Sequence, residues 1–152
     1  MSTEEREALA AQLRETERGE AASWVTYPPS PWWWPLAFGA WTFLYVLALG
    51  LLDGVAQAGA TFPLALVMVG VIAWERRRRG SWPTGRPPQQ LRRPMTVLFA
   101  GLLGIAGVAW LVGETVGTWP AAALAGVAVA GLVWWYGAAY DRVATQLRSR
   151  PA

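Results

Sequence analysis

Four apolar stretches, separated by polar connections, dominate the pattern of this chain. They cover about residues 35–52, 61–74, 95–112 and 119–140. The length of most of these stretches is close to the ~20 apolar residues that a helix needs to cross a bilayer core of ~30 Å. The stretch over 61–74 is short, so either residues 55–60 are also helical or the arginines after it snorkel from a continuing helix. The pattern predicts an all-α integral membrane protein: a four-transmembrane-helix bundle built from two helical hairpins.

The polar segments define the remaining organisation. Residues 1–31 are expected to form a cytoplasmic helix over 2–18 and a proline-rich linker, since Ser2 and Glu5 fit a capping box and Gly19 suits a helix end. Residues 32–140 form the transmembrane domain, which includes a basic loop at 75–94. Residues 141–152 form a tail into which the fourth helix can continue.

The distribution of arginine predicts the orientation. All 13 basic residues are arginine, and they flank the same ends of the four stretches. The links at the other ends contain only Asp53 and Glu114 as charged residues. The positive-inside rule therefore places both termini and the basic loop in the cytoplasm. Arginine without lysine, with abundant alanine and glycine, is typical of GC-rich bacterial genomes, so we expect a multi-pass protein of the bacterial inner membrane.

Tryptophan gathers at the same ends as arginine. Because its ring favours the headgroup level of a bilayer, we expect these residues to form an aromatic belt beside the basic loop. The arginines serve mainly as a topology signal, with anionic lipid headgroups or an acidic partner as the alternative. The residues expected at this boundary are Arg76, Arg77, Arg78, Arg79, Trp32, Trp33, Trp34, Trp74, Trp134 and Trp135.

Small residues recur along the third and fourth stretches. Such residues let membrane helices approach closely. They predict a face for packing within the chain, or alternatively for a homo-oligomer or another protein. The face consists of Gly101, Gly104 and Gly107 in the third stretch and Ala122, Gly126 and Ala130 in the fourth.

Site chemistry is sparse. Cysteine, histidine and lysine are absent, so we expect no disulfide, no His-ligated haem and no zinc or copper site of His or Cys. Ionisable residues lie at the boundaries of the stretches, which argues against a proton-coupled antiporter but leaves a passive pore open. Thr42 and Tyr45 are expected to form hydrogen bonds between helices. Asp53 and Glu114 could approach each other, but loop positions explain them better than acid–base chemistry. We expect no catalytic residue, cofactor or metal, and no nucleic-acid partner.

The second and fourth stretches open on similar sequences. Thr61 and Pro63 flank a phenylalanine, and Thr118 and Pro120 flank a tryptophan. Each threonine can cap a helix, and proline is tolerated in a first turn. The similarity indicates either ordinary helix starts or a duplicated hairpin.

One segment resembles a known family. Residues 30–36 (Ser-Pro-Trp-Trp-Trp-Pro-Leu) open an apolar hairpin that closes at Trp74 and Glu75. Residues 28–75 are thereby similar to a segment of polypeptide IV, the four-helix accessory subunit of actinobacterial cytochrome c oxidase. The resemblance implies a non-catalytic oxidase subunit without its own haem or copper.

These observations favour a small accessory or regulatory subunit that packs against a larger inner-membrane complex. The alternative is a homo-oligomeric channel or passive transporter. The expected partners are the lipid bilayer and either another membrane protein or further copies of this chain.

Overall fold

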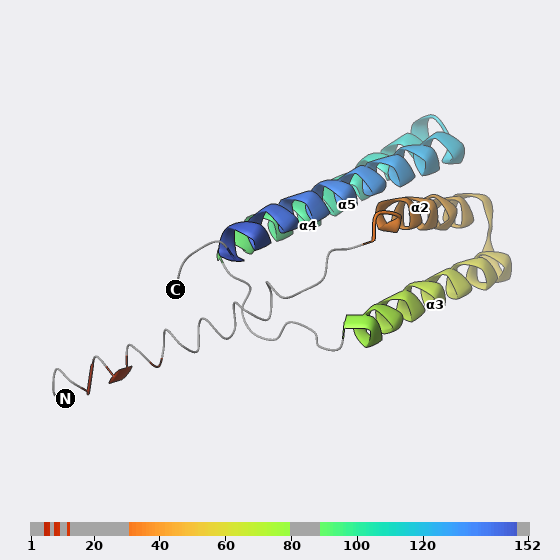
Figure 1. Ribbon diagram of the computed structural model, residues 1–152. Helices are drawn as coiled ribbons and strands as arrows, with labels where there is room; N and C mark the ends of the chain where they lie inside the picture. Colours follow the sequence, from red (N-terminus) through yellow and green to blue (C-terminus); the bar gives the residue numbers. More distant parts are fainter. Residues whose placement is uncertain (1–4, 7, 10–11, 13–30, 80–88, 149–152) are drawn as a thin grey trace.

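The computed structural model describes residues 5–6, 8–9, 12, 31–79 and 89–148. Its long elements are α2 (Trp34–Leu51), α3 (Gly54–Arg79), α4 (Gln89–Thr115) and α5 (Thr118–Arg148), shown in Figure 1. Each of the four is long and apolar enough to cross a membrane. The all-helical prediction with four such helices is therefore confirmed. Most of the expected helix over 2–18, the linker up to residue 30 and the middle of the basic loop lie outside the described residues.

Helix α5 is the centre of the arrangement. It packs on α2 along one side and on α4 along another, whereas α3 packs mainly on α2. Figure 1 shows α4 and α5 side by side and α3 inclined away from α2. The two predicted hairpins are thus joined through α2 and α5, and α3 lies at the edge.

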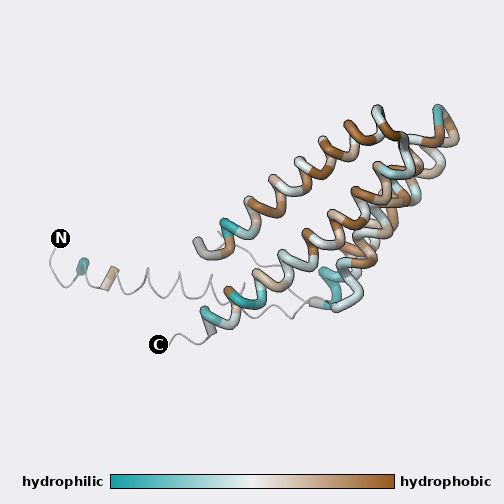
Figure 2. The backbone as a smooth tube through the Cα atoms, turned by 90° about the horizontal axis from the view of Figure 1, so that it is seen from above, coloured by the Kyte–Doolittle hydropathy of each residue, from teal (hydrophilic) through white to brown (hydrophobic). Residues whose placement is uncertain are grey.

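Neighbouring helices run antiparallel, so the chain has two distinct ends. At the basic end lie the exposed arginines Arg76, Arg77, Arg78, Arg92, Arg93 and Arg142. At the acidic end lie the two short turns, with Asp53 and Glu114 exposed. Figure 2 shows hydrophobic positions along the helices and hydrophilic ones near their ends.

Two helices begin earlier than the sequence pattern indicates. The second covers Gly54 to Arg79, so residues 55–60 and the arginines after residue 74 are both helical, as the two explanations of its short apolar stretch proposed. Pro63 lies inside it and removes one N–H donor from the helix. The third starts at Gln89, with Pro94 in its second turn. The basic loop expected at 75–94 is therefore helical at both ends, and Glu75 is a buried helical residue with 6% exposure.

The other two helices begin close to the residues that the sequence predicts. The first helix covers 34–51, close to the expected 35–52. The fourth continues beyond residue 140 into the tail, as expected, and ends at Arg148, because Val143 and Ala144 continue its packed face into the polar segment.

Both turns at the acidic end depend on glycine. Gly54 has φ of 54° and Gly117 has φ of 123°, in the region that L side chains rarely adopt. These residues let α3 and α5 begin within a few residues of the preceding helix.

Most of the buried apolar residues are small. Most are alanines, and α5 contributes more of them than any other helix. The buried apolar residues are Ala48, Leu91, Ala109, Ala121, Ala122, Ala125, Val129 and Ala144. Close backbone approach, rather than large interlocking side chains, therefore holds the helices together.

Candidate functional site

The crossing of α2 and α5 is formed by two glycines. A Cβ added to Gly39 would lie 2.7 Å from the carbonyl oxygen of Gly126 and 2.8 Å from Cβ of Ala130. A Cβ added to Gly126 would lie 2.9 Å from the carbonyl oxygen of Gly39 and 3.0 Å from Cβ of Phe43. Larger residues cannot occupy these positions unless the helices separate.

The predicted small-residue face is divided by the structure. Ala122 and Gly126 are buried, and Ala130 contacts α2 at the Gly39 crossing. Gly101 lies against α5, since a Cβ there would be 2.9 Å from Cδ2 of Leu132. Beside Gly104 and Gly107, by contrast, an added Cβ would have no neighbour within 4 Å. These two glycines belong to an open face of α4.

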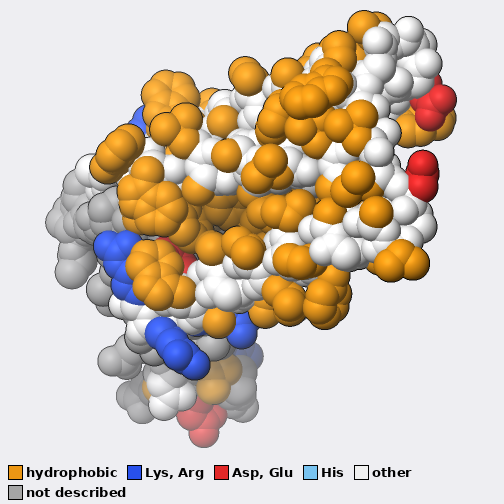
Figure 3. Space-filling view, turned by 90° about the vertical axis from the view of Figure 1, so that its right-hand side faces the viewer, with side chains coloured by type: hydrophobic (Ala, Val, Ile, Leu, Met, Phe, Trp, Pro, Cys, Tyr) orange, Lys and Arg blue, Asp and Glu red, His pale blue; other side chains and the backbone are white. Residues whose placement is uncertain are grey.

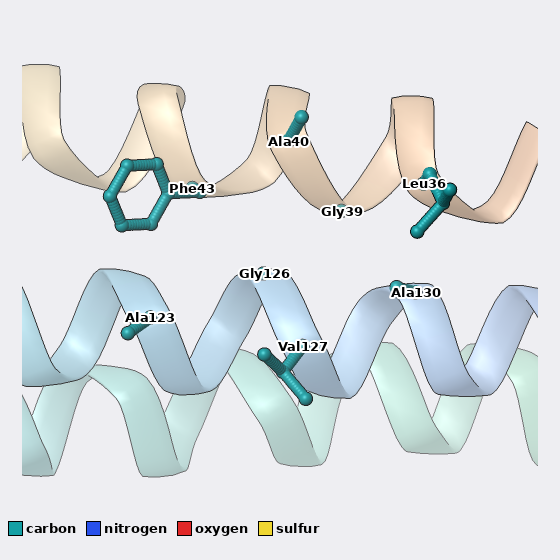
Figure 4. A pocket seen from close by; sticks show the side chains of 8 residues that line it. All are labelled: Leu36, Gly39, Ala40, Phe43, Ala123, Gly126, Val127 and Ala130. Atoms are coloured by element: carbon teal, nitrogen blue, oxygen red, sulfur yellow. The ribbon is translucent and has the colours of Figure 1, made fainter.

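An apolar groove borders the glycine crossing. It has a volume of about 360 Å³ and is open to the surroundings. Figure 4 shows its lining from α2 and α5: Leu36, Gly39, Ala40, Phe43, Ala123, Gly126, Val127 and Ala130. The groove exists because small side chains lie between larger ones on both helices.

A tryptophan links α3 to the rest of the molecule. The indole Nε1 of Trp41 donates a hydrogen bond to the carbonyl oxygen of Leu64 at 2.9 Å, and the Trp41 ring stacks on Tyr45 at 5.1 Å. Thr42, together with Tyr45, was expected to form a hydrogen bond between helices, but the Thr42 hydroxyl donates to Phe38 of its own helix at 2.8 Å. That prediction was wrong because a threonine on a helix readily reaches the carbonyl one turn back.

Two side chains donate hydrogen bonds to backbone carbonyl groups at the end of α2. Gln57 Nε2 donates to the carbonyl oxygen of Leu49 at 2.9 Å, and Thr118 Oγ1 donates to that of Gly50 at 3.3 Å. Carbonyl groups in the last turn of a helix lack partners within that helix. These bonds join the first turns of α3 and α5 to the last turn of α2.

The threonines of the two similar openings do different things. Thr118 begins α5 and bonds to α2, whereas Thr61 lies two turns inside α3 and donates to Gln57 of the same helix at 2.8 Å. Thr61 is therefore not a helix cap. The two openings are not structurally equivalent, and this correction removes the local support for a duplicated hairpin.

Aromatic and basic side chains meet at the basic end. The ring of Trp33 lies 5.3 Å from that of Trp34 and 6.4 Å from that of Trp74. The guanidinium carbon of Arg78 lies 5.5 Å from the centre of the Trp74 ring. We call Trp33, Trp74 and Arg78 the Trp–Arg ladder; it connects the start of α2 to the end of α3.

The remaining residues of the predicted belt are dispersed. Trp32 and Trp134 are strongly exposed, and Trp34 and Trp135 are half-buried. Arg76 and Arg77 are exposed beside the ladder, while the side chain of Arg79 lies outside the described residues. Figure 3 shows basic side chains toward one side of the molecule, whereas acidic side chains lie both at the opposite side and near the basic ones, with hydrophobic side chains between the two sides.

The two acidic residues at the turns of the acidic end belong to different hairpins. Asp53 precedes α3, and Glu114 lies in the last turn of α4. Among the described residues, no three acidic side chains are grouped so as to hold a metal ion.

Sequence reasoning missed three of the residues that make contacts. Gly39, Gly50 and Trp41 lie in the first stretch, where small residues recur less regularly than in the fourth. The signal that could have found Trp41 was an indole, with its N–H donor, in the middle of an apolar segment.

Comparison with protein-family models, curated proteins and solved structures finds no match to this chain.

Proposed function

We propose that this chain is a multi-pass protein of the bacterial inner membrane that acts as a non-catalytic accessory subunit. Its termini and basic end lie in the cytoplasm, and the outer face of α3 docks on a larger membrane protein. The outer face consists of Phe62, Leu66 and Val69, which recur at i, i+4 and i+7 on the side of α3 away from Leu64.

The separation of charge supports the membrane orientation. The described arginines occupy one end of the antiparallel helices, and the two turn carboxylates occupy the other. Cytoplasmic loops of inner-membrane proteins carry the excess of arginine. The helices between these ends are apolar, as a bilayer requires.

The exposure of α3 is the observation that carries the proposal. No residue in its apolar span is buried, and the outer-face side chains are 66%, 53% and 61% exposed. Helices associate in membranes through close packing and hydrogen bonds, because lipid tails are as apolar as the side chains. Helix α3 has a narrow contact with α2, so most of its packing surface is available to another protein.

A respiratory complex is the first candidate partner. The resemblance to an oxidase accessory subunit covers residues 28–75, and this segment includes α2 and the apolar part of α3. The helix that we propose to dock therefore lies within the segment that carries the resemblance.

The test is native mass spectrometry of a mild detergent extract. We expect the chain to be recovered with a different membrane protein. Leu66→Trp on the outer face should release that partner, whereas Leu103→Trp on an exposed position of α4 should retain it. A single-component oligomer that conducts solutes in liposomes would instead establish the channel alternative. A stable monomer without a partner or flux would contradict both.

A further inference from the structure

The Trp–Arg ladder has the chemistry of a phosphate site at a membrane boundary. In the described part of the chain, the guanidinium of Arg78 interacts only with the Trp74 ring, over which it lies. A cation–π contact with a ring does not use up the N–H donors of a guanidinium. These donors form a fork that matches two oxygens of a phosphate group.

An apolar track continues from the ladder along α3. Val67, Gly70, Trp74 and Arg78 follow one another at intervals of three or four residues, which places them on one face of the helix. Val67 is 56% exposed, and a Cβ added to Gly70 would meet no atom within 4 Å. From Val67 to Arg78 this track is about 16 Å long at 1.5 Å per residue, a length suited to part of an acyl chain.

We propose that the Trp–Arg ladder binds the phosphate of an anionic phospholipid, whose acyl chain lies along Val67 and Gly70. The net positive charge of the basic end selects an anionic over a zwitterionic headgroup. A lipid fits better than a soluble anion because the donors lie at the head of an apolar track. The outer face of α3, on Leu66 and Val69, lies on a different side and stays available to a protein partner.

The test is lipid titration of the purified full chain in detergent, followed by native mass spectrometry. The probes are phosphatidylglycerol and phosphatidylcholine with identical acyl chains. We expect phosphatidylglycerol to be preferred by at least about fivefold, because both lipids offer a phosphate but the arginines of the basic end repel the positive charge of choline. Inorganic phosphate in excess should not displace the lipid.

Matched variants distinguish specific binding at the Trp–Arg ladder from a general effect of positive charge. Arg78→Gln should strongly weaken the binding of phosphatidylglycerol, and Arg93→Gln, which removes an exposed arginine from α4 at the same end, should weaken it much less. Arg78→Lys keeps the charge without the planar fork and should also weaken the binding of phosphatidylglycerol, whereas Arg93→Lys should not. The lysine pair decides the question if Arg78→Gln fails to fold. Gly70→Leu, which fills the open position on the track, should weaken lipid binding without changing the fold.

Three results would overturn the proposal. Equal losses in the Arg78 and Arg93 variants would show that only total charge matters. Displacement by inorganic phosphate would show a soluble-anion site rather than a lipid site. Equal binding of the two phospholipids would show no recognition of the headgroup.

Discussion

The backbones of Gly39 and Gly126 are in contact where α2 crosses α5, and a Cβ on Gly39 would come within 2.7 Å of the Gly126 carbonyl oxygen. This contact joins the two hairpins. Because membrane helices gain stability from such close approach, the glycine crossing is the point at which the fold is most sensitive to side-chain size.

Enlarging Gly126 should therefore destabilise the protein. We expect Gly126→Leu to lower the free energy of unfolding by about 1–3 kcal/mol or more, since the added atoms overpack the crossing. Gly104→Leu adds the same atoms to a position on α4 where nothing lies within 4 Å, and should have little effect. Unfolding by dodecyl sulfate, followed by circular dichroism, measures both.

The corresponding alanine variants should change the free energy of unfolding in opposite directions. Alanine favours a helix over glycine by about 1 kcal/mol, so Gly104→Ala should be neutral or stabilising, while Gly126→Ala should be destabilising. Equal effects of the two alanines would contradict a close α2–α5 contact.

The Trp41 hydrogen bond should restrict the position of α3. Removing the indole donor with Trp41→Phe costs the bond to Leu64, worth about 0.5–1.5 kcal/mol. The sequence has no cysteine, so spin labels can be attached only at introduced Leu44→Cys and Leu66→Cys positions. Electron spin resonance should show a broader α2–α3 distance distribution in Trp41→Phe. An unchanged distribution, or the same broadening in the exposed control Trp110→Phe, would contradict this role.

The Thr118 hydroxyl should stabilise the end of α2. Thr118→Val leaves the carbonyl of Gly50 without this donor and should lower the free energy of unfolding by about 1 kcal/mol. Thr96→Val is the matched control, because the Thr96 hydroxyl donates to Arg92 within its own helix. The same dodecyl sulfate titration compares them; a larger loss in the control would be inconsistent with the α5–α2 bond.

The proposed orientation can be tested with single cysteines. Asp53→Cys and Glu114→Cys at the acidic end should react with a membrane-impermeant maleimide in intact spheroplasts. Thr145→Cys, in the part of α5 near the basic end, should react only after the membrane is opened. The reverse pattern of labelling would contradict the positive-inside assignment.

The helices were predictable from the sequence, whereas their contacts were only partly so. An apolar stretch of bilayer length is a property of one segment, and all four such segments are helices. Helix neighbours depend on pairs of segments. Gly126 and Gly104 are both glycines in regular small-residue patterns, yet one lies against α2 and the other faces outward. Spacing alone cannot separate these cases, because every face of a membrane helix is apolar.

Hydrogen bonds within a helix explain why two threonines do not act as expected. The Thr42 and Thr61 hydroxyls bond to carbonyls of their own helices, whereas Thr42 was expected to bond to another helix and Thr61 to cap one. The early start of α3 has a different cause. Gly54 supplies the positive φ of the turn, so the small residues that follow it can join the helix directly.

Photo-crosslinking from α3 in native membranes tests the central proposal most directly. A photoreactive amino acid at Val69, on the outer face, should give a discrete adduct with one other membrane protein. The same residue at Trp110, on the exposed part of α4, should give mainly lipid adducts. Lipid adducts alone at Val69, or adducts only with further copies of this chain, would contradict the accessory-subunit account.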